Sequence, residues 1–179
     1  VVLSGCGYLD GAEIHESVVT LLALDRAGAE VQCLAPDKPQ RDVVDHRTGQ
    51  AVEGESRNVL TESSRIARGE IQDVASARAD QFDAVVVPGG FGAAKNLSSF
   101  AVEGPGCTVD PGVESLLRDA HAAGKPIGLI CIAPNIAAKL FPGVDLTIGT
   151  DQATAGALEQ MGAHHKACAV EDFVCDEKA

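Results

Sequence analysis

One cysteine occupies a position where a thiol can act as a nucleophile. Cys131 ends the apolar run that starts at Pro126 and lies three residues before Pro134, which predicts a buried strand that turns directly into a helix. Such a turn exposes a nucleophile and directs the N–H groups that follow it at a bound substrate. The start of the helix is also expected to lower the pKa of the thiol and favour the thiolate. The alternative is an inert thiol in a core strand, and position alone does not decide between the two.

A pair of glycines follows another expected strand. Gly89 and Gly90 come directly after the apolar run 84–87 and Pro88. Without side chains, their backbone N–H groups can approach a ligand closely, as an oxyanion hole requires. The same pair also suits a plain tight connection, so the glycines support a site without proving one.

Two titratable residues lie in the first turns of a helix expected over 13–27. If Glu16 faces the cleft, its carboxyl can share a proton with Cys131 and act as a general acid/base. The alternative is a surface carboxylate that the helix dipole stabilises. His15 is expected to be a surface residue or a residue that supports the site.

Neither a metal site nor a disulfide framework is evident in the sequence. No set of His, Cys, Asp and Glu residues has convincing metal-ligand spacing. The six cysteines contain no Cys-x-x-Cys pair, and 179 residues can form a core without disulfides. We therefore expect free thiols, no metal and no cofactor.

The remaining pattern alternates strands with helices. Strands are expected over 1–4, 31–35, 84–87, 126–132 and 146–148, and one is expected to begin at His164 and His165. Helices are expected over 13–27, 57–68, 112–123, after Pro134, and over 153–161. Repeated alternation with glycine-rich turns predicts a mostly parallel sheet in a three-layer α/β/α sandwich. We find no linker and no repeat, so 1–179 is expected to form a single domain.

The composition narrows the class of partner. With 45% hydrophobic but only 3% aromatic residues, the core must consist mainly of Val, Leu, Ile and Ala. A net charge of −12 argues against nucleic-acid binding, because nothing would displace counterions from phosphates. No apolar stretch approaches the roughly 18–20 residues that cross a membrane, so no membrane partner is expected.

Four motifs together resemble those of one family. They are 3–7 (LSGCG), 10–16 (DGAEIHE), 88–97 (PGGFGAAKNL), and 124–128 (GKPIG) leading to 131–134 (CIAP). The chain resembles the ElbB/ES1 branch of the DJ-1/PfpI superfamily over essentially its whole length. This resemblance implies a flavodoxin-like sandwich of the kind also seen in class I glutamine amidotransferases.

The resemblance also implies roles for particular residues. Cys131 matches the nucleophilic cysteine, Glu16 the acidic residue that hydrogen-bonds it, and the N–H groups of Gly90 and Ile132 the oxyanion-hole donors. Members of the branch are described as glyoxalases that work without glutathione, an activity sometimes recast as protein deglycation. The implied partners are a small reactive dicarbonyl substrate and a second copy in a homodimer. The compartment is expected to be the cytoplasm for a bacterial protein and the mitochondrion for a eukaryotic one.

The sequence departs from the superfamily pattern in two places. Many members have a histidine after the next strand, whereas the stretch 146–151 (LTIGTD) has none. The base is therefore Glu16, His15 or water. Relatives also continue through another strand and a closing helix, which the domain 1–179 is expected to lack.

Two other functions share this fold. A glutamine amidotransferase needs a histidine and a carboxylate to complete a triad, for which His164 or His165 with Glu171 are the candidates. A redox sensor or protein-deglycating protein needs only a reactive, exposed thiol.

Overall fold

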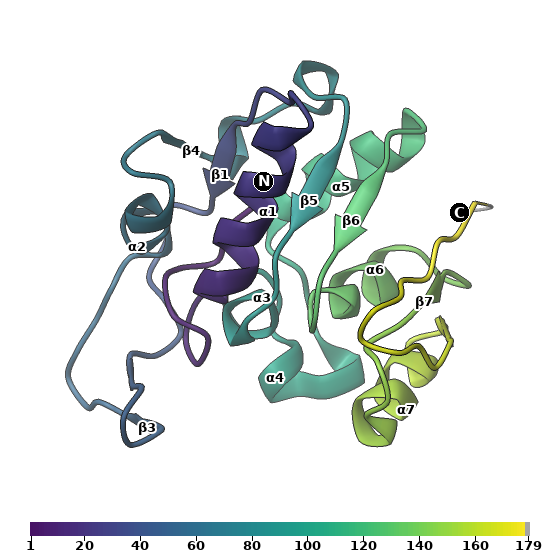
Figure 1. Cartoon of the computed structure of the whole chain (residues 1–179). Helices are drawn as coiled ribbons and strands as arrows, with labels where there is room; N and C mark the ends of the chain where they lie inside the picture. The colour runs from purple at the N-terminus through teal and green to yellow at the C-terminus, as the bar shows by residue number, and fades with distance from the viewer. Residues whose placement is uncertain (178–179) are drawn as a thin grey trace.

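The computed structural model describes residues 1–177, and short parallel strands form its centre (Figure 1). The parallel strands are β1 (Cys33–Ala35), β4 (Ile71–Asp73), β5 (Val85–Val87), β6 (Ile127–Leu129), β7 (Asp145–Leu146) and β8 (His164–His165). An antiparallel hairpin lies outside the sheet and consists of β2 (Val44–Asp45) and β3 (Gln50–Ala51).

Helices connect and cover these strands. The α-helices are α1 (Ile14–Arg26), α2 (Val59–Ile66), α3 (Phe91–Lys95), α4 (Phe100–Glu103), α5 (Pro111–Ala122), α6 (Pro134–Leu140) and α7 (Gln152–Gln160). Short 3-10 turns are found at Val74–Ser76, Ala79–Gln81 and Gly104–Gly106. None of the helices in residues 1–177 is long and apolar enough to cross a lipid bilayer.

The N-terminal segment lies between β1 and β5. Val2 N–H donates to Val86 O, and Leu3 N–H donates to Leu34 O, both with an N···O distance of 2.8 Å. Of this predicted strand, only Val2 forms a bridge, and its partner is Leu34. On the other side β5 pairs with β6 in parallel. The carboxyl ends of the N-terminal segment, β5 and β6 therefore meet at one edge, where ligands of such sheets bind.

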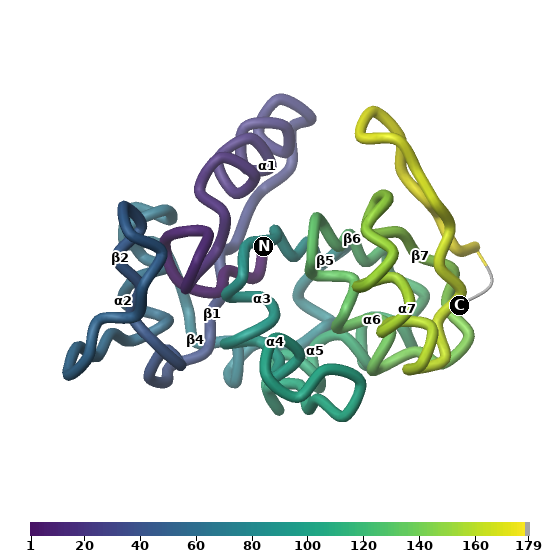
Figure 2. Tube along the Cα trace, turned by 90° about the horizontal axis from the view of Figure 1, so that it is seen from below, coloured from purple at the N-terminus to yellow at the C-terminus, as the bar shows by residue number. Residues whose placement is uncertain are grey.

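Side chains alternate between the two faces of the sheet, so each face is covered by a separate core. Val2 and Leu34 belong to the larger core, on the side of α5 and α6. Their neighbours Leu3 and Cys33 belong to the opposite core, which Leu21 of α1 contacts. Figure 2 shows α1 on one side of the strands and α3, α5 and α6 on the other. The prediction of a three-layer α/β/α sandwich is confirmed.

The apolar residues that predicted α1 do not face the sheet. Ile14, Val18, Val19 and Leu22 are 41–63% exposed, and Ser17 is the buried residue of the helix. The small serine allows a close approach, and its hydroxyl donates to Glu13 O over 2.7 Å. Periodicity thus predicted the helix correctly but did not indicate which side is buried.

The remaining predictions about the domain stay open. That 1–179 form a single domain stays a prediction. Residues 178 and 179 of the expected domain lie outside the described residues.

Candidate active site

Cys131 lies in a strained turn between β6 and α6. Ile130 N–H makes the last contact with β5, to Val87 O at 3.0 Å, and Ala133 N–H then donates to Ile130 O at 3.0 Å. Between them Cys131 adopts a φ of +60°. This left-handed conformation costs a residue with a side chain about 1–3 kcal/mol. The geometry is that of a nucleophile elbow, and Cys131 is exposed.

Three groups surround the thiol. One comes from the loop after β5, one from α1, and one from the turn that contains Cys131. The backbone N–H groups of Gly90 and Ile132 and the side chain of Glu16 all lie close enough to the Cys131 thiol to shift its pKa as hydrogen-bonding partners. Gly90 ends the loop after β5, whereas Ile132 follows the cysteine in its own turn. The residues that the resemblance assigned to the site therefore lie together, and their catalytic roles stay a prediction.

The start of α1 positions Glu16. Glu13 is the N-cap, and its carboxylate accepts the N–H of Glu16 at 2.7 Å. Its own N–H donates to Gly89 O at 2.9 Å, which attaches the helix start to the loop after β5. Gly89 N–H in turn donates to Glu16 Oε2 at 2.8 Å. These contacts turn the carboxyl of Glu16 toward Cys131.

Both glycines of this loop are needed for close packing. A Cβ on Gly89 would lie 2.4 Å from Cys131 Cβ and 2.6 Å from Glu16 Oε2. A Cβ on Gly90, which has a φ of +89°, would lie 2.4 Å from Glu13 N. Gly89 therefore leaves room for the thiol and the carboxyl, and the N–H of Gly90 reaches the sulfur.

The surroundings raise the pKa of both members of the pair. Although Cys131 is exposed as a residue, partial burial of its thiol is the main reason that the pKa of this group lies above its usual value, and the charge of Glu16 raises it further. The N–H groups of Gly90 and Ile132 oppose this increase in pKa. Burial likewise raises the pKa of Glu16, against the N–H of Gly89. The expectation of a lowered thiol pKa is wrong, because burial and a neighbouring carboxylate outweigh the N–H groups.

The histidines lie apart from this cluster. His15 is 92% exposed, and its Nδ1 lies 2.9 Å from Glu13 Oε1 rather than beside Glu16. His164 Nδ1 contacts Asp145 Oδ1 at 3.2 Å, and His165 Nε2 accepts Ile148 N–H at 3.3 Å. Both belong to β8, as the sequence predicted for the start of a strand.

Among residues 1–177, the other cysteines and the possible metal ligands form no second centre of this kind. All six cysteines are free thiols. Within residues 1–177, no group of three or more His, Cys, Asp and Glu side chains could hold a metal ion.

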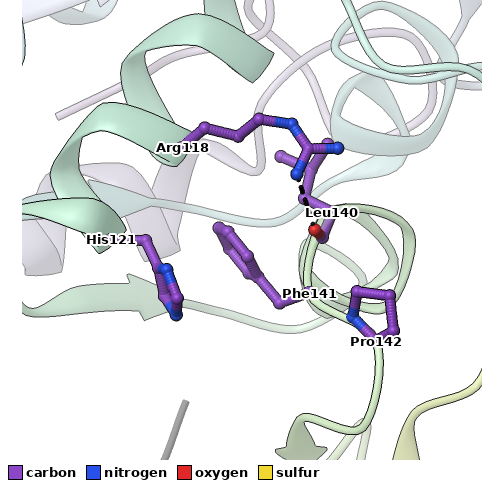
Figure 3. A pocket seen from close by; sticks show the side chains of 5 residues that line it. All are labelled: Arg118, His121, Leu140, Phe141 and Pro142. Atoms are coloured by element: carbon purple, nitrogen blue, oxygen red, sulfur yellow. Dashed lines mark hydrogen bonds between the residues drawn. The ribbon is translucent and has the colours of Figure 1, made fainter.

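A hollow of about 310 Å³ lies away from the cysteine, where α5 and α6 end (Figure 3). Arg118 already contacts Glu114 at 2.7 Å and Leu140 O at 2.9 Å, and His121 stacks on Phe141 with ring centroids 4.4 Å apart. The ends of these helices lead into the starts of β6 and β7, at the edge of the sheet opposite Cys131. The hollow contains none of the predicted site residues.

Sequence reasoning missed two contributors to the arrangement. Glu13 caps α1 and carries the contact to Gly89. Its position three residues before Glu16, at the start of the helical pattern, was the available signal. The buried pair Ser98 and Asn135 also supports the turn, and no sequence spacing indicates that these two residues meet.

Fold and site together define a flavodoxin-like α/β protein with a cysteine at the strand-to-helix elbow. The DJ-1/PfpI family model matches residues 6–172. The chain belongs to this family, and within it to the ElbB/ES1 branch, as relatives named ES1 proteins indicate.

These relatives are similar over nearly the whole chain. The human "glutamine amidotransferase-like class 1 domain-containing protein 3, mitochondrial" is 54% identical over 99% of this chain and 70% of its own length. The rat "ES1 protein homolog, mitochondrial" is 51% identical over the same shares. The zebrafish "ES1 protein, mitochondrial" is 37% identical over 99% of this chain and 72% of its own.

Solved structures agree on the fold. A protein from Ehrlichia chaffeensis described as an "isoprenoid biosynthesis protein with amidotransferase-like domain" superposes with a TM-score of 0.85 at 40% identity, over 93% of this chain and 77% of its own. A two-domain protein from Anabaena variabilis, with DJ-1/ThiJ/PfpI-like and ferritin-like domains, reaches a TM-score of 0.55 at 20% identity. It covers 87% of this chain and 36% of its own, and supports the fold alone.

Proposed function

We propose that this protein is a glutathione-independent glyoxalase that converts glyoxal or methylglyoxal to a 2-hydroxy acid. The observation that carries the proposal is the close approach of the Glu16 carboxyl and Cys131 around Gly89, where a Cβ would lie 2.6 Å from Glu16 Oε2 and 2.4 Å from Cys131 Cβ. The N–H groups of Gly90 and Ile132 act on the same thiol and lower its pKa. A nucleophile, an acid/base and two oxyanion donors thus surround one point. The proposed reaction requires no cofactor.

The first half of the reaction forms a covalent adduct. The thiol proton passes to Glu16, and the thiolate adds to an aldehyde carbon of glyoxal. The electron pair of the C=O bond moves to oxygen, and the N–H groups of Gly90 and Ile132 stabilise the resulting oxyanion. Glu16 then returns its proton to that oxygen, which gives a hemithioacetal and leaves Glu16 as a carboxylate.

The second half moves a proton between the two substrate carbons. Glu16 removes the proton from the carbon bonded to sulfur, which gives an enediol, and returns a proton to the neighbouring carbon. The first carbon then becomes the carbonyl of a thioester, which water hydrolyses to glycolate with release of the Cys131 thiol. Glyoxal plus water equals glycolic acid, so no oxidant or reductant is consumed. The raised pKa of Glu16 favours this role, because a carboxyl that titrates closer to neutrality both accepts and returns a proton.

The Cys131→Ala variant tests this proposal. We expect it to abolish formation of glycolate from glyoxal and to leave the circular dichroism spectrum unchanged. Cys6→Ala is the matched control, because Cys6 is a half-buried thiol at a neighbouring strand end, and this variant is expected to remain active. Turnover that persists in Cys131→Ala would exclude the mechanism.

The alternatives have less support in the geometry. An amidotransferase needs a histidine beside the nucleophile, but His164 contacts Asp145 and His165 contacts the backbone of Ile148. A redox-sensing or deglycating role uses the same exposed thiol, and a glyoxal turnover rate too low to matter would favour it. A homodimer and a mitochondrial or cytoplasmic location stay predictions, and "mitochondrial" in the names of the mammalian and fish relatives supports the former location for a eukaryotic source.

A further inference from the structure

We propose that Asn135 and Ser98 are positioning residues that hold the two N–H donors of the site, Gly90 and Ile132, at a fixed separation. The assignment of these N–H groups to an oxyanion rests on the proposed function. Their effect on the thiol does not, because both N–H groups already lower the pKa of Cys131 in the resting protein.

The two donors belong to loops that separate after the last contact between β5 and β6. That contact is the hydrogen bond from Ile130 N–H to Val87 O at 3.0 Å. Beyond it, the first loop continues through Gly90 into α3, and the second continues through Ile132 into α6. A further connection is required if the donors are to stay on the same side of one sulfur atom.

A buried side-chain bridge supplies this connection. Asn135 is fully buried, and its Nδ2 donates to Ile132 O at 2.7 Å. Ser98, which is 5% exposed, lies on the other side, with its Oγ 2.7 Å from Asn135 Oδ1. The same hydroxyl lies 3.1 Å from Ala93 O in α3, and its single proton is shared between the two carbonyl oxygens. The bridge thus runs from the residue that provides one donor to the short helix that begins directly after the other.

The polar chemistry of the bridge suits a role in positioning the N–H donors better than a role in fold stability alone. An apolar pair of similar size could fill the same space without polar groups to satisfy, since a buried hydrogen bond contributes little net stability. A hydrogen bond fixes direction as well as distance, and an oxyanion hole requires donors within 2.7–3.1 Å of a defined point. Loss of the bridge is therefore expected to affect the N–H groups before it affects the fold.

The thiol itself reports on this geometry without any substrate. Because the N–H groups of Gly90 and Ile132 lower the pKa of Cys131, their displacement raises that pKa and lowers the thiolate fraction at a given pH. The experiment measures the rate of Cys131 alkylation by iodoacetamide from pH 6 to 10 in the full chain, followed by peptide mass spectrometry to separate Cys131 from the other thiols. The variants are Ser98→Ala, Asn135→Ala and the double variant.

We expect each variant to move the pH profile of alkylation to higher pH and to slow the reaction at pH 7.5 by roughly 3-fold or more. The turnover number with glyoxal should fall by roughly 10- to 100-fold with little change in KM, because an oxyanion interaction forms in the transition state. If the residues act as one bridge, the double variant should resemble the single variants rather than add their effects. Ser98→Thr, which keeps a hydroxyl, should restore most of the wild-type profile.

Leu158→Ala is the control for stability. Leu158 is fully buried in α7, in a core without the bridge residues, so this variant should lower the melting temperature and leave the alkylation profile in place.

Variants of the bridge that lower the melting temperature but leave both the alkylation profile and the turnover number unchanged would overturn the inference. If the wild type does not turn over glyoxal but the bridge variants still shift the profile, the proposed function fails and the positioning role stands. If Asn135→Ala does not fold, Ser98→Ala alone decides by the same criteria.

Discussion

At the scale of single residues, Cys131 and Glu16 behave as one titrating unit. Each group is close enough to the other to hydrogen-bond it, and burial disfavours the charged form of both. Two negative charges in this space are costly, so the pair retains a proton that isolated side chains would lose at a lower pH. The retained proton is the one that the proposed reaction moves.

Replacement of Glu16 by glutamine is expected to make Cys131 more reactive toward a simple alkylating agent. The charge of Glu16 raises the pKa of the thiol, so its removal lowers that pKa and shifts the pH profile of alkylation to lower pH. At pH 7 we expect iodoacetamide to react roughly 3- to 10-fold faster with Glu16→Gln than with the wild type. Slower alkylation in the variant would mean that Glu16 activates the thiol rather than restrains it.

The exposed His15 provides the matched control. Its side chain contacts Glu13 rather than the thiol, so His15→Gln should leave the pH profile of Cys131 unchanged. A shift of similar size in this variant would assign the effect to general surface charge.

At the scale of helices and strands, the sequence predicted most elements but not their contacts. Helix ends were accurate where a cap or a proline fixes them, as in α5, where Asp110 accepts Gly112 N–H at 3.0 Å and Pro111 follows the cap. β4 was missed, because Ile71, Gln72 and Asp73 show no strand pattern until they pair with β1. The strands were also shorter than predicted, as β6 shows by ending at Leu129.

The site could be predicted only in part, because the sequence shows local features but not long-range contacts. Strand ends and family motifs pointed to Cys131, Glu16 and Gly90, because these features are local in the sequence. The bridge of Ser98 and Asn135 joins residues 37 positions apart, and only the packing of α3 against α6 brings them together. The raised thiol pKa likewise depends on burial and on a carboxylate more than a hundred residues away, which a helix N-terminus in the sequence does not reveal.

The close packing of the two loops makes Gly89 the most sensitive backbone position. A Cβ there would lie 2.4 Å from Cys131 Cβ, so Gly89→Ala must displace the thiol or the Glu16 carboxyl. We expect glyoxal turnover to fall by about 100-fold and the free energy of unfolding by about 1–3 kcal/mol. Turnover is measured by glycolate formation, and stability by denaturant unfolding.

The control for this variant is Gly156→Ala in α7. No atom lies within 4 Å of a Cβ at this position, and alanine favours a helix by about 0.5–1 kcal/mol over glycine. The control should therefore be more stable than the wild type and equally active. Full activity in Gly89→Ala would show that a Cβ at position 89 fits beside Cys131 and Glu16 without displacing them.

At the scale of the whole molecule, two sides of α1 differ in character. One side carries Glu16 toward the carboxyl edge of the sheet, and the other exposes Ile14, Val18, Val19 and Leu22 to solvent. An exposed apolar stripe on an otherwise acidic protein with a net charge of −12 is the surface most suited to the predicted homodimer. A dimer formed there would lie next to the helix that holds the acid/base.

The double variant Val18→Asp/Val19→Asp tests this arrangement. We expect a homodimer for the wild type and a monomer for the variant, measured by light scattering after size-exclusion chromatography, because four added charges per dimer would be buried at the interface. Val102→Asp, on an exposed residue of α4, should leave the dimer intact. A monomeric wild type would contradict the homodimer, and a dimer that survives the double substitution would place the interface elsewhere.

The most direct test of the account is the rate of glycolate formation from glyoxal by Glu16→Gln at pH 7. Glutamine keeps an oxygen that can accept Gly89 N–H and leaves the thiol in place, but it cannot remove or return a proton. The account predicts that this variant, although its thiol is more reactive toward alkylation, turns over glyoxal at least about 100-fold more slowly than the wild type. A turnover rate equal to that of the wild type would contradict the assignment of Glu16 as the acid/base partner of Cys131.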